Sequence, residues 1–450
     1  MPRGLRSTIA LFVVLVGLGA YIYFVSSKKT PGSSTPDREK VFAKVEADKI
    51  EELKIKSASG DVTELKKSGD KWQITAPQAL PAAEPELIGI TSALGQMEVV
   101  RVVDENPTDL KEFGLVTPRV EVDFKSSDGK PSGRVAFGDK TATGGNMYAK
   151  RNDEKRVFLV ADYQDGSLNK STFDLRDKTL LKIEREKVDA VTLESGGKTV
   201  ALAKEGSDWK ITKPLTARAD YSAADGVVGR IESAQMKSIV SNEATAADLK
   251  KYGLDKPEVT VTVGQGSARA VLAFGGKSGE DAVYARDLSK PAIVTVEKSV
   301  ADDLKKPADD FRRKEAFESR AFNMTRVEIT RGADTVVFER VKGTGENPVD
   351  SWKRVSPNPG DPDKSKVEAM LAGLADIRAT SFTDTTAKTG LDKPAMTVLV
   401  KFDDGKKEEK VSFGKNGSDV YALIAGQPGA GKIEAEKFDE ANKTLDELSK

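Results

Sequence analysis

The chain contains no cysteine and no histidine among its 450 residues. Without cysteine it has no disulfides, no thiolate ligands for a metal and no cysteine nucleophile. Without histidine it lacks the commonest metal ligand and the commonest general base, and with them every Ser-His-Asp or Cys-His arrangement. An oxygen-ligated Ca²⁺ or Mg²⁺ site, a two-carboxylate hydrolase or a Ser-Lys pair stays open. Nothing singles out such a pair among 71 acidic residues, so we expect no enzyme, no cofactor and no metal.

The chain also lacks an excess of charge of either sign. Lysine and arginine total 71, aspartate and glutamate total 71, and charged residues make up 32% of the chain. The charges are interspersed, which is typical of a solvated surface. No Lys/Arg-rich run marks a nucleic-acid interface, so we expect no nucleic-acid partner.

One segment, Thr8–Val25, is long, apolar and uncharged, and arginines and lysines flank it (Arg3, Arg6, Lys28, Lys29). Eighteen helical residues span about 27 Å, just enough to cross a bilayer core. The alternatives are a cleaved signal peptide and a soluble helix. The apolar region is long for a signal peptide and no A-x-A cleavage site follows it, which favours an uncleaved anchor over residues 1–25.

Residues 26–44 are rich in serine, proline and charge and are typical of a linker. The positive charges on the two sides of the apolar segment are nearly balanced, so they do not decide its orientation. The short tail before it is typical of a signal-anchor with a cytoplasmic N-terminus. We therefore expect a single-pass protein of a bacterial inner membrane, held by residues 8–25, with its bulk in the periplasm.

The three tryptophans of the chain lie in one repeated phrase. Trp72, Trp209 and Trp352 each precede a proline by five residues, and the tryptophans are separated by 137 and 143 residues. Further landmarks follow in a fixed order, namely Gly-Leu (Gly114, Gly253, Gly390), Phe-Gly (Phe137, Phe274, Phe413) and Tyr-Ala (Tyr148, Tyr284, Tyr421). Four ordered landmarks at one period indicate a module of about 137 residues present three times. A unit of this length can bury its own core. We expect modules at residues 45–182, 183–320 and 321–450.

Each module is expected to begin with two short strands joined by a turn, followed by the strand that carries the tryptophan. The expected strand pairs are Ile50–Ile55 with Val62–Leu65, Val188–Leu193 with Thr199–Leu202, and Arg326–Ile329 with Thr335–Phe338. In the third copy an extra loop, Lys342–Ser351, precedes the tryptophan. An amphipathic helix follows, clearest in Val367, Met370, Leu371, Leu374 and Ile377.

The Gly-Leu phrase predicts a helical turn that ends at a left-handed glycine, because proline follows shortly after. Alternating apolar residues then predict a β-meander. Phe173–Leu181 and Asp309–Phe317 are expected to be helical exits. The fold class is therefore α+β: an N-terminal transmembrane helix followed by three tandem domains, each a mostly antiparallel sheet with one main packed helix.

The repeated aromatic residues have two possible roles. Trp72, Trp209 and Trp352 could form a stacking surface for sugars or peptides, one in each module, or could anchor the core. We favour core anchors, and the same interpretation applies to Tyr148, Tyr284 and Tyr421. We also expect Gly114, Gly253 and Gly390 to be structural anchors.

One segment, Gly426–Lys432, matches the nucleotide-binding pattern GxxxxGK. Ile433 stands where a Mg²⁺-binding serine or threonine is needed, and the sequence predicts no long helix after it. The repeat register places the segment between two strands. We expect a glycine-rich hairpin loop and no nucleotide.

The phrases W-x-I-x-x-P, [FY]-G-L-x-x-P and F-G…Y-A resemble those of the bacterial DUF4340 family, a membrane-anchored domain of unknown function. The resemblance covers nearly all of residues 45–430 in three copies. The third copy departs from the pattern, with Thr389 in place of the aromatic residue and Arg354-Val355 within the tryptophan phrase. Family members are often encoded near ABC-type transporters, which implies an accessory role in the envelope by association only.

The function expected from the sequence is that of a non-enzymatic, membrane-anchored envelope protein. It would act as an accessory or scaffold component of a membrane complex such as an ABC-type transporter, with an integral-membrane protein as partner. The alternative is an extracytoplasmic protein that binds a ligand or glycan in clefts between modules.

Overall fold

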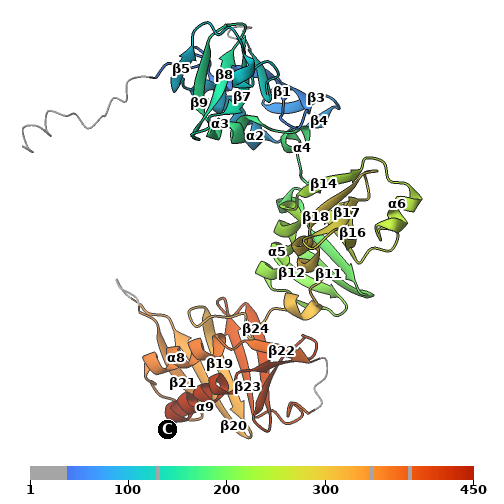
Figure 1. Ribbon diagram of the computed structural model, residues 1–450. Helices are drawn as coiled ribbons and strands as arrows, with labels where there is room; N and C mark the ends of the chain where they lie inside the picture. The colour runs from blue at the N-terminus through green and yellow to red at the C-terminus, as the bar shows by residue number, and fades with distance from the viewer. Residues whose placement is uncertain (1–37, 128–131, 345–348, 384–387, 450) are drawn as a thin grey trace, which may run out of the picture. The chain divides into compact units, whose positions relative to one another are not determined.

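A computed structural model describes residues 38–127, 132–344, 349–383 and 388–449 (Figure 1). The chain divides into two compact units, Met1–Asp177 and Lys178–Lys450. The expected anchor, residues 8–25, and most of the expected linker lie outside the described residues. Within the described ranges, no helix is long and apolar enough to cross a membrane.

The described residues form three β-sheets, and all the paired strands in these sheets are antiparallel. This confirms the expected class of three mostly antiparallel sheets with few helices. The first sheet has the order β4-β3-β2-β1-β6-β7-β8-β9-β5. Its strands are β1 (Ile50–Lys56), β2 (Val62–Ser68), β3 (Lys71–Ala76), β4 (Leu80–Pro81), β5 (Arg101–Asp104), β6 (Val120–Ser126), β7 (Ser132–Lys140), β8 (Asn146–Arg151) and β9 (Val157–Ala161).

The second and third sheets repeat this strand order, the third without a counterpart of β4. The strands of the second sheet are β10 (Ala190–Ser195), β11 (Lys198–Glu205), β12 (Asp208–Lys213), β13 (Ala217–Arg218), β14 (Met236–Ser241), β15 (Val259–Gln265), β16 (Ala268–Lys277), β17 (Ala282–Asp287) and β18 (Ile293–Glu297). Those of the third are β19 (Met324–Arg331), β20 (Asp334–Val341), β21 (Ser351–Ser356), β22 (Ala379–Thr383), β23 (Met396–Phe402), β24 (Lys407–Asn416), β25 (Asp419–Ile424) and β26 (Ala430–Ile433).

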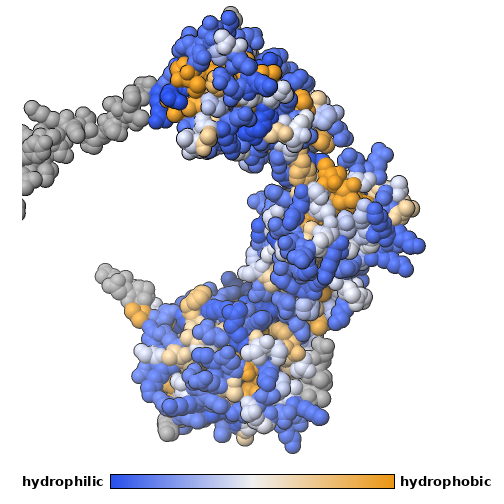
Figure 2. Space-filling view, viewed as in Figure 1, coloured by the Kyte–Doolittle hydropathy of each residue, from blue (hydrophilic) through white to orange (hydrophobic). Residues whose placement is uncertain are grey.

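Alternation along the strands sets which face of each sheet is buried. On β15 the side chains of Val259, Val261 and Val263 are buried while the threonines between them are partly exposed. Successive residues of a strand point to opposite faces, so an alternating sequence buries one face and leaves the other to solvent. The visible surface of the molecule is accordingly mostly hydrophilic (Figure 2).

One main helix connects the two edges of each sheet. These helices are α2 (Glu84–Gln96), α5 (Tyr221–Glu232) and α8 (Lys364–Ala375). In the first two modules the helix leaves one edge strand (β4 or β13) and returns to the opposite edge strand (β5 or β14), so it must cross the buried face. Asp220 and Asp363 cap α5 and α8 by accepting a hydrogen bond from a backbone N–H of the first turn.

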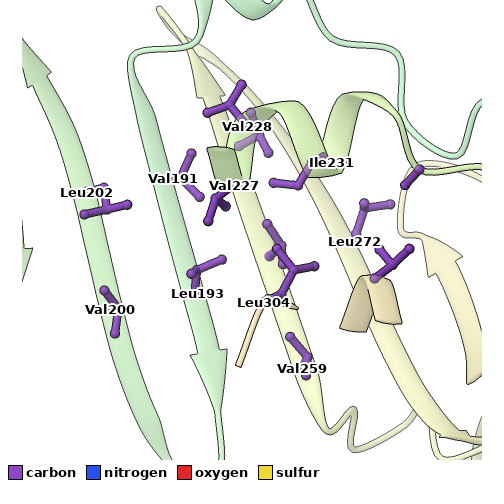
Figure 3. Close-up of a cluster of buried hydrophobic side chains, with 14 of the residues drawn as sticks. Val191, Leu193, Val200, Leu202, Val227, Val228, Ile231, Val259, Leu272 and Leu304 are labelled. Atoms are coloured by element: carbon purple, nitrogen blue, oxygen red, sulfur yellow. The ribbon is translucent and has the colours of Figure 1, made fainter. Parts of the chain in front are cut away.

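Each module has its own hydrophobic core between the helix and the sheet. In the second module Val227, Val228 and Ile231 of α5 meet Val191 of β10 and Leu272 of β16 (Figure 3). Separate clusters of the same kind occupy the first and third modules. The expected pattern of one apolar stripe packed on one sheet therefore recurs in all three copies.

Each main helix is followed by a strand that the sequence analysis does not predict. β5, β14 and β22 pair with the final strand of the meander, β9, β18 and β26 respectively. They are short, and none shows the full alternation of a half-buried strand. Tertiary pairing at the free edge of the sheet creates them, and local sequence does not.

The expected helical exits are largely wrong. Helix is limited to α4 (Thr172–Leu175) and to the 3₁₀ turn η4 (Ala308–Phe311), and the backbone then becomes extended. The buried side chains of Leu175 and Phe311 hold these turns in the core. The residue after each forms a β-bridge to the edge of the sheet, which prevents the helix from continuing.

Three further helices close the modules after the last strand of the meander. α3 (Tyr163–Leu168) and α7 (Lys298–Asp303) are short. α9 (Ala435–Ser449) is long, and the sequence-based expectations include no helix there, although its buried residues have helical spacing (Phe438, Ala441, Leu445, Leu448). A short α6 (Ala246–Lys251) precedes the second Gly-Leu phrase.

Candidate functional site

The three tryptophans lie in the cores of their modules. The side chains of Trp72, Trp209 and Trp352 are 5%, 2% and 2% exposed, and they lie on the equivalent strands β3, β12 and β21. The Lys204 ammonium lies 5.1 Å from the centroid of the Trp209 ring, and the Arg340 guanidinium lies 5.0 Å from that of Trp352. Rings so little exposed offer no stacking face to a sugar or peptide.

The Gly-Leu glycines adopt the left-handed conformation that the sequence predicts for them. The φ angles of Gly114, Gly253 and Gly390 are 67°, 72° and 71°. An L side chain is strained at such an angle, so glycine is the residue that ends these turns at least cost.

The glycine of each Phe-Gly phrase explains why this phrase accompanies the Gly-Leu phrase. A Cβ built on it would meet the carbonyl oxygen of the residue before the left-handed glycine, a distance far below van der Waals contact. These distances are 1.9 Å from Gly138 to Phe113, 2.3 Å from Gly275 to Tyr252 and 2.4 Å from Gly414 to Thr389. The two phrases are therefore the two sides of one backbone contact. The sequence showed their shared period but not this reason.

The repeated tyrosines lie on the face of the sheet opposite the main core. The Tyr148 ring is 5.1 Å from that of Phe113, and the Tyr284 ring is 4.3 Å from that of Tyr252. Small apolar clusters surround both pairs. In the third module Thr389, which is buried, takes the place of the aromatic residue beside Tyr421. The sequence-predicted aromatic anchors therefore form two groups, one on each face of the sheet.

The solvent face of the first sheet carries a ladder of ion pairs across strands. Glu52 lies 3.0 Å from both Lys66 and Lys125, Lys54 lies 2.9 Å from Glu64, and Lys56 lies 2.7 Å from Glu121. Hydrogen bonds from its two lysines hold the pKa of Glu52 below its usual value. Exposed pairs of this kind keep the face solvated and contribute little stability each.

The GxxxxGK segment forms the predicted hairpin. β25 and β26 pair antiparallel, the turn between them contains Gly426 and Gly429, and the last residues of the segment, 430–432, lie in β26. The Lys432 ammonium lies 2.9 Å from Asp419, and this hydrogen bond raises the lysine pKa. A phosphate-binding loop needs a helix N-terminus aimed at the ligand. The expectation that no long helix follows is wrong, since α9 begins at Ala435, but that helix starts after strand β26 and not at the glycine-rich turn. In the described parts of the chain, no cluster of three or more acidic side chains is placed to hold a metal ion.

A cavity of about 410 Å³ lies beside Trp209. Tyr221, Arg218 and Arg313 contribute to its walls. Burial lowers the pKa of Arg218, as does the nearby charge of Arg313, while neighbouring carboxylates oppose this. The Trp209 Nε1–H has no hydrogen-bond partner among the described residues. The repeat pattern does not reveal this cavity, because Arg218 and Arg313 belong to no repeated phrase.

Comparison with protein families matches the model described as a domain of unknown function, DUF4340, to residues 72–210, 209–359 and 352–450. The chain belongs to the DUF4340 family. Each matched segment begins at or close to a tryptophan phrase, while the sheets begin at Ile50, Ala190 and Met324. The sequence unit of DUF4340 is therefore shifted relative to the folded unit, and each of the first two matches runs into the next sheet.

No curated protein matches the chain. A crystal structure described as a DNA polymerase III beta subunit from Eubacterium rectale ATCC 33656 is 7% identical, over 87% of this chain and 92% of that chain, with a TM-score of 0.16. A TM-score this low supports no inference about fold or function.

Proposed function

We propose that this protein is a non-enzymatic, membrane-anchored scaffold of the bacterial envelope. Its three modules bind other proteins of a membrane complex, such as an ABC-type transporter. The chain would be held by residues 8–25, with its bulk in the periplasm. The apolar stretch in the sequence and the association of DUF4340 domains with transporters support this placement.

The observation that carries the proposal is the contrast between buried and exposed positions of the repeat. The strand registers make Ile55, Leu193 and Ile329 equivalent, and all three are buried. The residue before each faces the opposite side of the sheet. It is a cation (Lys54) in the first module, neutral (Thr192) in the second and an anion (Glu328) in the third.

A triplicated catalytic or ligand site would need the same polar groups at equivalent positions. The residues that recur in this chain instead pack the core or shape the backbone, as the tryptophans and glycines do. Surfaces that differ between copies of one rigid fold suit different contacts with partner proteins, because charge pattern sets partner choice more than affinity.

Crosslinking in cells followed by mass spectrometry tests the proposal. Full-length chain should recover integral-membrane proteins, and a chain that ends at residue 320 should lose a subset of them. A version lacking residues 1–25, directed to the periplasm by a cleaved signal, is the control for membrane attachment. Recovery of self-crosslinks alone would contradict the scaffold function.

A ligand-binding function is the second candidate, and the cavity beside Trp209 favours it. Its wall combines the Tyr221 ring and two arginines with the carboxylates of Asp208, Asp220, Glu315 and Glu318. A few charged groups on the wall of a cavity fix the orientation of a polar ligand. Native mass spectrometry of purified chain would detect a bound small molecule, and Arg313→Ala should remove it. Retention by the variant would place the ligand elsewhere.

A further inference from the structure

The glycine-rich loop of the third module contacts the second module. This loop, residues 425–429, joins β25 to β26 and contains the first part of the segment that matches GxxxxGK. The Gln427 side chain accepts a hydrogen bond from the Arg218 backbone N–H at 2.8 Å, and the Pro428 carbonyl accepts one from the Arg312 guanidinium at 2.6 Å. Arg218 and Arg312 both belong to the second module, so the loop joins two folded units.

Arg312 is buried by groups of the third module. Its side chain is 4% exposed, and its guanidinium lies 3.8 Å from the centroid of the Phe382 ring on β22. Arginine is almost never fully buried unless its charge is paired. The Pro428 carbonyl and the Phe382 ring supply a charge-assisted hydrogen bond and a cation–π contact, while Asp309 of the second module lies 3.6 Å away. The burial of this charge therefore depends on contact between the two modules.

Gln427 lies at the open edge of the second sheet. β13, which contains Arg218, is the outermost strand and pairs with β12 on one side. The outer side of such a strand presents N–H and C=O groups without partners from the sheet. Gln427 accepts from the Arg218 N–H, and the Arg218 carbonyl accepts from the Arg313 N–H at 3.0 Å. The loop therefore satisfies a backbone group that the second sheet leaves open.

The connection between the two modules passes directly from one sheet to the other. The Arg313 N–H donates to the Arg218 carbonyl of the second sheet. The carbonyl of the next residue, Lys314, accepts a hydrogen bond from the Ala379 N–H of the third sheet at 2.8 Å. Consecutive residues are thus held by different modules, which makes this point a pivot. A pivot alone permits rotation, and the loop adds a second attachment that restricts it.

The equivalent loop of the second module has a different chemistry. The strand registers match residues 425–429 with residues 288–292, a loop of the same length. Lys290 stands at the position of Gln427 and is exposed, whereas Gln427 is half-buried. A lysine side chain has only donors, so it cannot accept a hydrogen bond from a backbone N–H. Loop tips normally lie in solvent, and the partial burial of Gln427 reflects the neighbouring module.

We propose that residues 425–429 form a latch that fixes the third module on the second, so that the two modules move as one rigid body. Both modules lie in one compact unit, Lys178–Lys450. Domains of one chain move relative to each other unless their interface holds them. Here the directed bonds of Gln427 and Arg312 supply that restraint. The latch does not depend on the identity of any partner, so it stands or fails separately from the scaffold function.

Spin labels on the two modules test the latch in the full chain. The chain contains no cysteine, so Gly226→Cys on α5 and Ala369→Cys on α8, both at exposed positions, supply the only labelling sites. Double electron–electron resonance should give one narrow distribution of distances between the labels. Arg312→Met combined with Gln427→Ala removes both hydrogen bonds. This double variant should widen the distribution at least about twofold, because domains without a restraining interface move freely.

Arg354→Met combined with Gln265→Ala is the matched control. The Arg354 guanidinium donates to the Leu448 carbonyl at 2.7 Å within the third module, and the Gln265 amide donates to the Glu184 carbonyl at 2.9 Å within the second. The control loses the same two kinds of side chain and should keep the narrow distribution. A broad distribution in the labelled parent would overturn the proposal. So would a latch variant as narrow as the parent, or equal widening in the control.

Gln427→Ala alone supplies a second measurement that leaves both cores intact, and it decides the case if the double variant does not fold. Hydrogen exchange of the Arg218 amide, followed by NMR, should become about fivefold to tenfold faster, as expected for the loss of one hydrogen bond. Gln265→Ala should leave this rate unchanged. Exchange at Arg218 that is the same in Gln427→Ala as in the parent would show that the loop does not hold the edge strand, and the latch would be refuted.

Discussion

Replacing Gly275 with alanine should destabilise the second module strongly. The new Cβ would lie 2.3 Å from the Tyr252 carbonyl oxygen, so one of the two backbone segments must move. The same oxygen accepts a hydrogen bond from the Gly276 N–H at 2.9 Å, which that movement would stretch. Overpacking costs about 1–3 kcal/mol, and backbone yields less than a side chain, so the upper end applies. With about 1 kcal/mol for the hydrogen bond, we expect a loss of about 3–4 kcal/mol.

The single tryptophan of each module supplies the assay. In a background that carries Trp72→Phe and Trp352→Phe, fluorescence of Trp209 reports unfolding of the second module alone. With a urea m-value of about 2 kcal/mol/M, the midpoint should fall by about 1.5 M or more. Gly226→Ala is the matched control. Gly226 is exposed on α5 with no atom within 4 Å of the added Cβ, and this change should stabilise by about 0.5–1 kcal/mol.

A Gly275→Ala midpoint close to that of the parent, with Gly226→Ala behaving as expected, would refute the reasoning. It would mean that the Phe-Gly and Gly-Leu phrases tolerate a wider separation than the structure shows. The recurrence of the close approach at Gly138 and Gly414 extends the same expectation to the other modules.

Three further predictions concern other residues. Trp209→Ala should cost about 3–5 kcal/mol, measured by hydrogen exchange of α5, because the ring is buried; a change near zero would place the ring at the surface. Burial raises the pKa of Asp287, but hydrogen bonds from Ser289 and Lys290 outweigh it and hold the pKa below its usual value. Its ionised form therefore stabilises the fold above about pH 4, and this stabilisation is lost as pH falls further. Asp287→Asn should lower the urea midpoint at pH 7 and lower it less as the pH falls below about 4; an effect that does not change with pH would contradict the carboxylate's role. Calorimetry should detect no Mg²⁺-dependent ATP binding to the parent or to Lys432→Ala, and micromolar binding that the variant abolishes would overturn the hairpin interpretation.

Much of the fold can be predicted from the sequence because the repeated residues act on the backbone and on burial within a few positions of themselves. A left-handed turn needs glycine, as at Gly253, and alternating valines, as on β15, bury one face of a strand. These requirements act within a few residues. The period of the repeat, the meander and the main helix are therefore predictable from the chain alone.

Contacts between distant residues decided the rest. The edge strands β5, β14 and β22 exist because a partner strand offers free hydrogen-bonding groups, and their own residues show little preference for them. The glycine contact between Gly275 and Tyr252 joins residues far apart in the chain. The starting point of each folded unit also depends on the sheet, since a tandem sequence has a period but no intrinsic phase.

The difference between the three copies is likewise tertiary. After the last strand of the meander the first two modules have a short helix, α3 or α7, followed by an extended exit segment, whereas the third has the long helix α9. Helical spacing in α9 was present in the sequence, but only packing shows which core it covers. The sequence by itself determined the fold of the repeated module, because glycine turns and alternating apolar residues act locally. The tertiary structure alone decided which segments pair or pack across each module, because those contacts join residues that lie far apart in the chain.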